Sequence, residues 1–217
     1  MATRTKQATR GKTRPALSRE RIVAAALDLV DRRGLDALSM RALGAELGVE
    51  AMSLYKHVDG KGAIVDAMVE AAIDEVDWTG DAAAPWQQRI EHAAGGFLAL
   101  GRAHPELFPL LLAREPRGDS VLRPIEAILA PLAEAGLERA QAVSVFWTLL
   151  AYLYGAVVCE LGQRTDGAPQ ALPRSLLEAA DGFPASKAAA NELANCDAGD
   201  EFLAGVRRIL AGSIPAT

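Results

Sequence analysis

The sequence predicts an all-α protein with an N-terminal three-helix unit, built around a helix-turn-helix, and a larger helical domain after it. Half of the 217 residues are hydrophobic but only 5% are aromatic, and Ala and Leu are abundant. These side chains lose little rotamer freedom in a helix. Apolar residues recur at three- and four-residue spacing through most of the chain, and no segment shows the period-two pattern of a strand.

The first sixteen residues predict a disordered basic arm, because residues 1–16 contain five basic residues and no acid and end near Pro15. Two interpretations remain open. The arm is either a mobile tail without a role, or a segment that follows the DNA backbone or enters the minor groove.

Four helices are expected next. Ser18 is a good N-cap for the first, and Gly34 ends it. Ser39 caps a short second helix that Gly48 ends, a third covers 50–57, and a fourth covers 61–77. The segment from Ser39 to Val58 has the layout of a helix-turn-helix: two short helices with a Gly-containing turn.

The exposed side chains of this segment suit DNA. Small residues at the start of the third helix allow close approach to base edges, and Met52 can contact a thymine methyl. Tyr55, His57 and Lys61 suit phosphate oxygens, and Arg41 can reach a base or a phosphate. Residues 1–61 carry 12 basic and 7 acidic side chains, although the whole chain has a net charge of −5. The alternative is an ordinary helical hairpin whose Tyr and His complete a core.

Residues 18–77 resemble the DNA-binding domain of the TetR family of bacterial regulators. The resemblance is carried by Ala24 to Gly34, by Leu38 to Val49, and by Leu54, Tyr55, His57, Val58 and Lys61. It implies DNA contacts by residues of the second and third helices and the start of the fourth: Ser39, Met40, Arg41, Ala51, Met52, Ser53, Tyr55, Lys56, His57 and Lys61. Ala51-Met52-Ser53 and Lys56 differ from the tetracycline repressors, which leaves the operator sequence open.

The expected domains are the arm at 1–16, the DNA-binding domain at 17–62 with a connecting helix to 78, and an effector-binding and dimerisation domain at 79–217. A linker covers 79–85, and the stretches 162–173 and 181–197 are expected to be loops. A short apolar piece covers 107–113, and further helices are expected at 86–103, 121–135, 137–161, 174–180 and 198–212.

The resemblance continues more weakly beyond residue 85 and implies a homodimer with a small-molecule site. The helix at 137–161 has charges only near its ends, so it must be covered. Pairing it and the 198–212 helix with their two-fold mates forms a four-helix bundle and presents two recognition helices to a near-palindromic operator in double-stranded DNA.

The expected effector is a largely hydrophobic small molecule, with no cofactor and no metal. The candidate wall is apolar and aromatic: Phe97, Phe108, Leu111, Trp147, Leu150, Tyr154 and Val158. His92, His104 and Arg114 are candidate polar contacts, although a surface or capping role is the expectation for each. Leu111 and Ala151 fall near the positions where tetracycline repressors place histidines, which argues against a magnesium–tetracycline effector.

The expected function is a repressor that a small molecule releases from its operator. A TetR-like activator and a constitutive DNA binder remain alternatives. No nucleophile elbow, phosphate loop or metal cluster points to an enzyme. The sequence has no signal peptide and no apolar stretch of about 18 residues that lacks both charge and Gly, and Cys159 and Cys196 fit no metal or redox spacing. These features predict a cytoplasmic protein away from the membrane.

Overall fold

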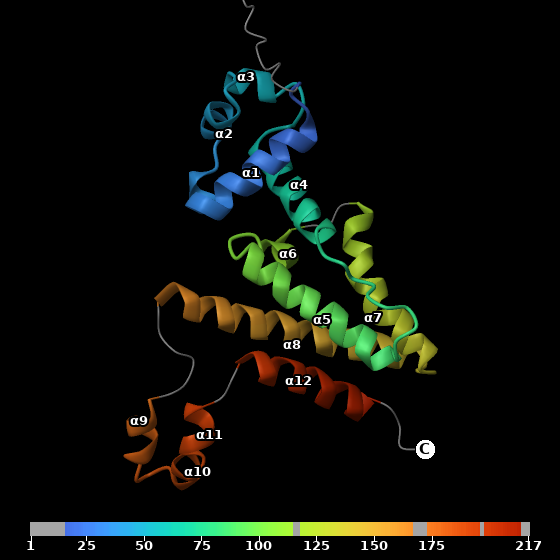
Figure 1. The fold of residues 1–217 in the computed structure, drawn as a ribbon, viewed down its shortest axis with the longest axis vertical. Coiled ribbons are helices and arrows are strands. Elements are labelled where there is room, and N and C mark those ends of the chain that lie inside the picture. Colours follow the sequence, from blue (N-terminus) through green and yellow to red (C-terminus); the bar gives the residue numbers. More distant parts are fainter. Residues whose placement is uncertain (1–15, 115–117, 167–172, 196–197, 214–217) are drawn as a thin grey trace, which may run out of the picture.

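A computed structural model describes residues 16–114, 118–166, 173–195 and 198–213, and in these ranges every regular element is a helix. Figure 1 shows an N-terminal part (α1–α4) on top of a C-terminal part (α5–α12), with α4 running from one into the other. The all-α expectation is confirmed.

The N-terminal part contains four α-helices and one short 3-10 helix. The side-chain oxygens of Ser18 and Ser39 accept hydrogen bonds from Arg21 N and Ala42 N, so both predicted N-caps are present. The elements are α1 (Arg19–Arg33), η1 (Leu35–Ala37), α2 (Met40–Leu47), α3 (Ala51–Leu54) and α4 (Lys61–Asp74).

The core of this part lies between α1, α2, α3 and α4. Ile22 of α1, Leu43 of α2, Leu54 of α3 and Met68 of α4 are all fully buried. The three- and four-residue spacing of apolar residues along α1 forms the single face that α2 and α4 cover. The short α2 and α3 are therefore fixed by packing against α1.

The C-terminal part contains eight α-helices and a second 3-10 helix. Helices α5, α7, α8 and α12 pack on one another, and α8 and α12 lie side by side (Figure 1). The elements are α5 (Trp86–Ala103), α6 (Leu110–Ala113), η2 (Asp119–Val121), α7 (Leu122–Glu134), α8 (Arg139–Asp166), α9 (Arg174–Glu178), α10 (Pro184–Ala188), α11 (Ala190–Ala194) and α12 (Ala198–Ser213).

Three expected segments differ from the structure. The third helix is one turn long and residues 55–57 form a turn, because Gly60 and the tight chain reversal follow at once. Helix α8 extends to Asp166, beyond the expected end at 161. The loop expected after residue 180 contains α10, with Pro184 at its start, and α11.

Helices α9, α10 and α11 pack on one another and stand apart from α5, α7 and α12 in Figure 1. Leu176 and Phe183 are exposed on them, by 60% and 68%. This group therefore has its own small core around Leu177 and Ala190 and contributes little to the packing of the main helices.

Within the described part of the chain, one segment, Arg139–Leu161 of α8, is long and apolar enough to cross a membrane, with a mean hydropathy of 1.9. The uncharged run within this segment contains Gly155, in agreement with the expectation that no apolar stretch of about 18 residues lacks both charge and Gly. The helix packs against α5, α7 and α12, and 33% of the apolar stretch is buried within this chain. Length and composition alone are weak evidence of a span, since a packed helix has the same properties.

Candidate nucleic-acid interface and ligand cavity

The turn between α2 and α3 depends on two glycines. Gly48 adopts a left-handed conformation (φ 66°, ψ 39°), and Val49 N donates to Gly44 O at 2.8 Å. A Cβ atom at Gly44 would lie 2.9 Å from Val49 O and 3.2 Å from Ala51 N. The absence of a side chain at Gly44 thus lets the start of α3 approach α2, as a helix-turn-helix requires.

The segment from Ser39 to Lys61 presents most of the predicted DNA-contacting side chains to solvent. Met52 is 72% exposed and Tyr55 is 50% exposed. Ser39, Arg41, Lys56, His57 and Lys61 are exposed, and Met40, Ala51 and Ser53 are partly buried. The predicted residues therefore share one surface around α3 and the two adjoining helix starts.

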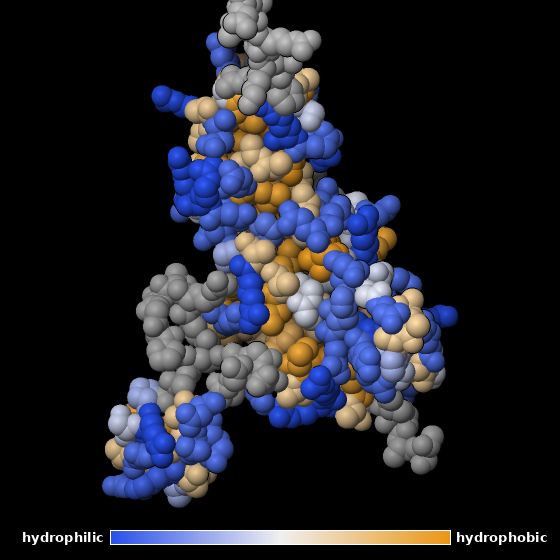
Figure 2. Space-filling view, in the orientation of Figure 1, coloured by the Kyte–Doolittle hydropathy of each residue, from blue (hydrophilic) through white to orange (hydrophobic). Residues whose placement is uncertain are grey.

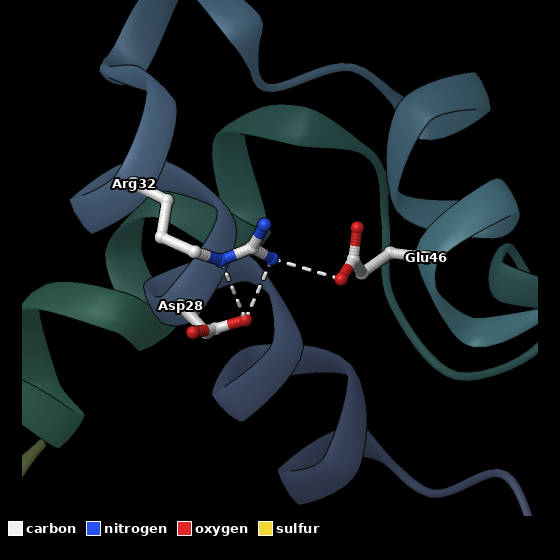
Figure 3. Close-up of polar contacts among 3 residues, drawn as sticks. All are labelled: Asp28, Arg32 and Glu46. Atoms are coloured by element: carbon white, nitrogen blue, oxygen red, sulfur yellow. Dashed lines mark hydrogen bonds and ion pairs between the residues drawn. The ribbon is translucent and has the colours of Figure 1, made fainter.

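The charges of the N-terminal part are divided between paired and unpaired groups. Arg32 of α1 donates to Asp28 at 2.7 Å and to Glu46 of α2 at 2.8 Å, and Figure 3 shows its guanidinium between the two carboxylates. Arg41, Lys56 and Lys61 have no ion pair among the described residues. Asp28 and Glu46 are thus engaged by Arg32, and the three unpaired basic groups remain available to phosphate.

A cavity of about 310 Å³ lies below the N-terminal part, between α4, α5, α6, α7 and α8. Its wall is mainly aliphatic and aromatic. Figure 2 shows hydrophobic atoms at the surface where α4, α6 and α7 meet, within a mostly hydrophilic face. An apolar hollow of this size suits a small organic molecule.

Four of the seven predicted ligand-binding residues line this cavity: Phe97, Leu111, Trp147 and Leu150. Phe108 and Tyr154 do not, because Phe108 is 1% exposed and its ring stacks on that of Tyr154 with centroids 5.3 Å apart. Val158 lies outside the lining as well and is 42% exposed. The spacing of apolar residues identified the apolar faces of these helices. It did not show which side chains pack against other helices and which border the cavity.

Arg114 was expected at the surface or at a helix end, and it does follow α6, but it also lines the cavity. Its Nε donates to Asp66 of α4, and its Nη2 lies 3.3 Å from Gly62 O. Asp66 and Glu70, four residues apart on α4, are the acidic members of the wall. The sequence analysis missed both, although two acids on one face of an otherwise apolar helix were a usable signal.

His104 has the expected capping position and a buried side chain as well. It caps the end of α5 through its N–H to Leu100 O, but it is also buried, with 6% exposed. Its Nδ1 lies 3.2 Å from Asp31 of α1 and its Nε2 lies 3.1 Å from Glu75, which follows α4. Burial lowers the pKa of His104, but the carboxylates of Glu75 and Asp31 raise it by more, so the net pKa lies above its ordinary value.

Further contacts tie the N-terminal part to the C-terminal part. Arg123 of α7 lies 3.1 Å from Asp74, and Glu106 accepts a hydrogen bond from Leu35 N. His92 is exposed and lies near Asp77, at the expected surface position and away from the cavity wall. Among the described residues there is no group of three side chains that could hold a metal ion.

A helix-turn-helix with unpaired basic side chains defines the N-terminal part as a DNA-binding unit, and one shared helix joins it to an apolar cavity. Residues 22–68 match the family model described as bacterial regulatory proteins, tetR family, and residues 80–214 match the tetracyclin repressor-like C-terminal domain. The chain belongs to the tetR family of transcriptional regulators, which are not enzymes.

Named relatives agree with this assignment. The chain is 34% identical over 152 residues to the HTH-type transcriptional repressor DrrR1 of Streptomyces coeruleorubidus, covering 70% of this chain and 56% of that protein. It is 30% identical to the class A tetracycline repressor of transposon 1721 from Escherichia coli, covering 73% and 77%. The chain spans 56% and 63% of the lengths of DrrR1 and of a transcriptional regulator from Saccharopolyspora erythraea.

Solved structures share the fold over nearly the whole chain. A TetR regulator from Streptomyces coelicolor superposes with a TM-score of 0.79 at 28% identity, covering 91% of this chain and 98% of that one. ActR of the same species, solved in complex with actinorhodin, has a TM-score of 0.77 at 25% identity, covering 91% and 95%. The predicted membership of the TetR family of transcriptional regulators is confirmed.

Proposed function

We propose that this chain acts as a cytoplasmic homodimer that represses transcription from a near-palindromic operator and leaves it when a largely hydrophobic molecule fills the cavity. The observation that carries the proposal is that α4 packs in the N-terminal part with one set of residues and lines the cavity with another. Ile64 and Met68 are buried among the helices of the N-terminal part, whereas Asp66, Val69, Glu70 and Ile73 line the cavity.

Release from the operator follows because the DNA-binding part and the cavity share α4. A molecule that occupies the cavity must contact one face of α4, and the opposite face supports α1. A shift of α4 changes the position of α3 relative to that of the second protomer, so the two DNA-contacting surfaces no longer match the groove spacing. Only a molecule that binds one arrangement better than the other has this effect.

The dimer proposal is supported by the outer face of α8. Val143, Trp147 and Val158 are exposed by 40%, 61% and 42%, and Ala151 between them is also exposed. An apolar stripe of this length on a helix adjoining α12 suits pairing with a second copy about a two-fold axis. Such pairing also places two helix-turn-helix units on the same side of the dimer.

The DNA contacts proposed are those of the exposed surface around α3. Met52 and Ser53 on α3 and Arg41 on α2 face base edges, and Tyr55, Lys56, His57 and Lys61 bind phosphates. Ser39, Met40 and Ala51 lie on the same surface and permit close approach. The basic arm before Pro15 falls outside the described residues and is proposed to add phosphate contacts.

The experiment measures binding to duplex DNA from the protein's own promoter region over a series of salt concentrations. A Tyr55→Ala, Lys61→Ala variant is expected to bind more weakly, with a log–log salt slope smaller by about 1 because one cationic phosphate contact, that of Lys61, is lost. Lys187→Ala, which removes one exposed positive charge from α10, is the matched control and is expected to leave the slope unchanged. Unchanged binding in the double variant contradicts the DNA-contact assignment.

A second measurement tests release. Operator affinity is determined in the presence of hydrophobic small molecules that raise the melting temperature of the protein. Loss of affinity with such a molecule supports release, an increase supports an activator, and no effect of any stabilising molecule contradicts ligand control.

A further inference from the structure

Among the described residues, the charged side chains of the cavity wall are not all paired. Three of them border the hollow, namely Asp66, Glu70 and Arg114. Arg114 is engaged by the Asp66 carboxylate and by Gly62 O. Glu70 is partly buried and has no hydrogen bond or ion pair among the described residues. Glu70 is thus a carboxylate without a described partner at the edge of an apolar space.

An unpaired carboxylate beside an apolar hollow is unfavourable until a cation or a hydrogen-bond donor meets it. Solvent at the cavity mouth stabilises Glu70 when the cavity is empty, but an apolar molecule that fills the cavity removes part of that water. A molecule that brings its own positive charge replaces the lost hydration, whereas a neutral hydrocarbon does not.

The remaining wall also suits a cation. Trp78, Phe97, Phe146 and Trp147 contribute aromatic rings from α5, α8 and the segment after α4. The faces of aromatic rings attract ammonium groups, and the attraction grows when the site excludes water. An anion, in contrast, would have to displace Asp66 from Arg114 and would lie within reach of the uncompensated Glu70 charge.

We propose that the cavity selects a lipophilic cation, an apolar ring system with a protonated amine whose charge lies against Glu70. The proposal rests on the proposed function in treating the cavity as the effector site. It goes further by specifying that the effector is positively charged and that Glu70 recognises this charge. Because Glu70 lies on α4, one turn after Asp66, the charged end of the molecule acts on the helix that supports the DNA-contacting surface.

The test uses three probes with one hydrocarbon cage and different charges: adamantylamine as the cation, adamantanol as the neutral form and adamantane carboxylate as the anion. Each is titrated into the full-length protein at neutral pH by calorimetry. The fluorescence of Trp78 and Trp147 is followed in parallel to place binding at the cavity. Glu70→Gln removes the charge with almost no change of shape, and Glu192→Gln removes an equal charge from exposed α11 as the matched control.

Adamantylamine is expected to bind the wild-type protein about tenfold more tightly than adamantanol, the scale of one charge-assisted hydrogen bond. The ratio should fall to about one in Glu70→Gln and stay at the wild-type value in Glu192→Gln. Equal binding of the three probes, preference for the carboxylate, a preference that survives Glu70→Gln, or no binding of any probe overturns the proposal.

Operator binding separates this inference from the proposed function. A Glu70-dependent preference for the amine with unchanged operator affinity supports the cation site and contradicts ligand-driven release. Loss of operator affinity caused equally by adamantanol and adamantylamine supports release and contradicts the cation site.

Discussion

The imidazole Nε2 of His104 lies 3.1 Å from the Glu75 carboxylate, so the residue that ends α5 contacts the residue that ends α4. The other ring nitrogen lies 3.2 Å from Asp31 of α1. A carboxylate accepts hydrogen bonds, so both contacts are satisfied together only when the two ring nitrogens carry protons. His104 thus joins the two parts of the chain best in its charged form.

This arrangement predicts a pH-dependent stability. The folded-state pKa of His104 is raised, so its contribution is complete below the unfolded pKa of about 6.5 and is lost as the pH rises through the higher folded pKa. His104→Gln, which cannot gain a proton, should lower the free energy of unfolding by about 1–3 kcal/mol below pH 6.5 and by less in alkaline solution.

Urea unfolding of both proteins across this pH range measures the effect. His92→Gln is the control, because His92 is exposed and lies beside Asp77 on one side only. The charged contact is contradicted if the loss of unfolding free energy in His104→Gln is constant with pH or grows in alkaline solution.

A second prediction concerns the turn of the helix-turn-helix. Gly44→Ala puts a methyl group 2.9 Å from Val49 O, a backbone atom that cannot move without displacing α3. The expected cost is about 1–3 kcal/mol in the free energy of unfolding, with weaker operator binding. Gly95→Ala on α5 meets nothing within 4 Å and should instead stabilise by about 0.5–1 kcal/mol. Thermal unfolding of the two variants distinguishes them, and equal melting temperatures would falsify the close approach.

A third prediction uses two tyrosines of α8. The Tyr152 hydroxyl lies 3.1 Å from Glu201 O and 3.0 Å from Phe202 O of α12, and burial raises the pKa of its phenol. Tyr152→Phe should destabilise by about 1 kcal/mol through loss of this donor. The hydroxyl of Tyr154 is 3.5 Å from Pro109 O, too long for a strong bond, so Tyr154→Phe should have almost no effect. Denaturant midpoints that fall equally in both variants count against this assignment.

A fourth prediction concerns the basic arm. Residues 16–61 contain seven basic and seven acidic side chains, so the positive balance of the first 61 residues comes from Arg4, Lys6, Arg10, Lys12 and Arg14. Replacing all five with Gln should weaken DNA binding and reduce the salt slope by about 0.9 for each phosphate that the arm contacts. Removing the uncharged residues 214–217 is the control. An unchanged slope in the Gln variant favours a tail without a role.

Local signals were sufficient for much of the fold. The caps at Ser18 and Ser39, the left-handed Gly48 and the bounds of α5 followed from short-range rules on capping and apolar spacing. Helices α10 and α11 were missed because each has five residues, too few for a clear apolar period, in a stretch that also contains Gly and Pro.

The cavity and the contacts around it could not be derived in the same way. His104 and Asp31 are 73 positions apart in sequence, and the Arg114–Asp66 contact spans 48 positions. Spacing within one helix carries no information about such partners. Leu111 and Phe108 belong to the same apolar run, yet only Leu111 borders the cavity, because the helices around it decide where a hollow remains.

The interleaving of the two faces of α4 limits how this protein can be recombined with its relatives. A chimera joined at Gly60 keeps the cavity-lining residues of α4, but Ile64, Val65 and Met68 then pack against the α1 of the relative. A junction in the linker after Trp78 takes the whole of α4 from the relative. It preserves those contacts, but the relative's residues then replace Asp66 and Glu70 in the cavity wall. A hybrid sensor with a new operator therefore needs a composite α4, with its α1-facing residues taken from one parent and its cavity-facing residues from the other.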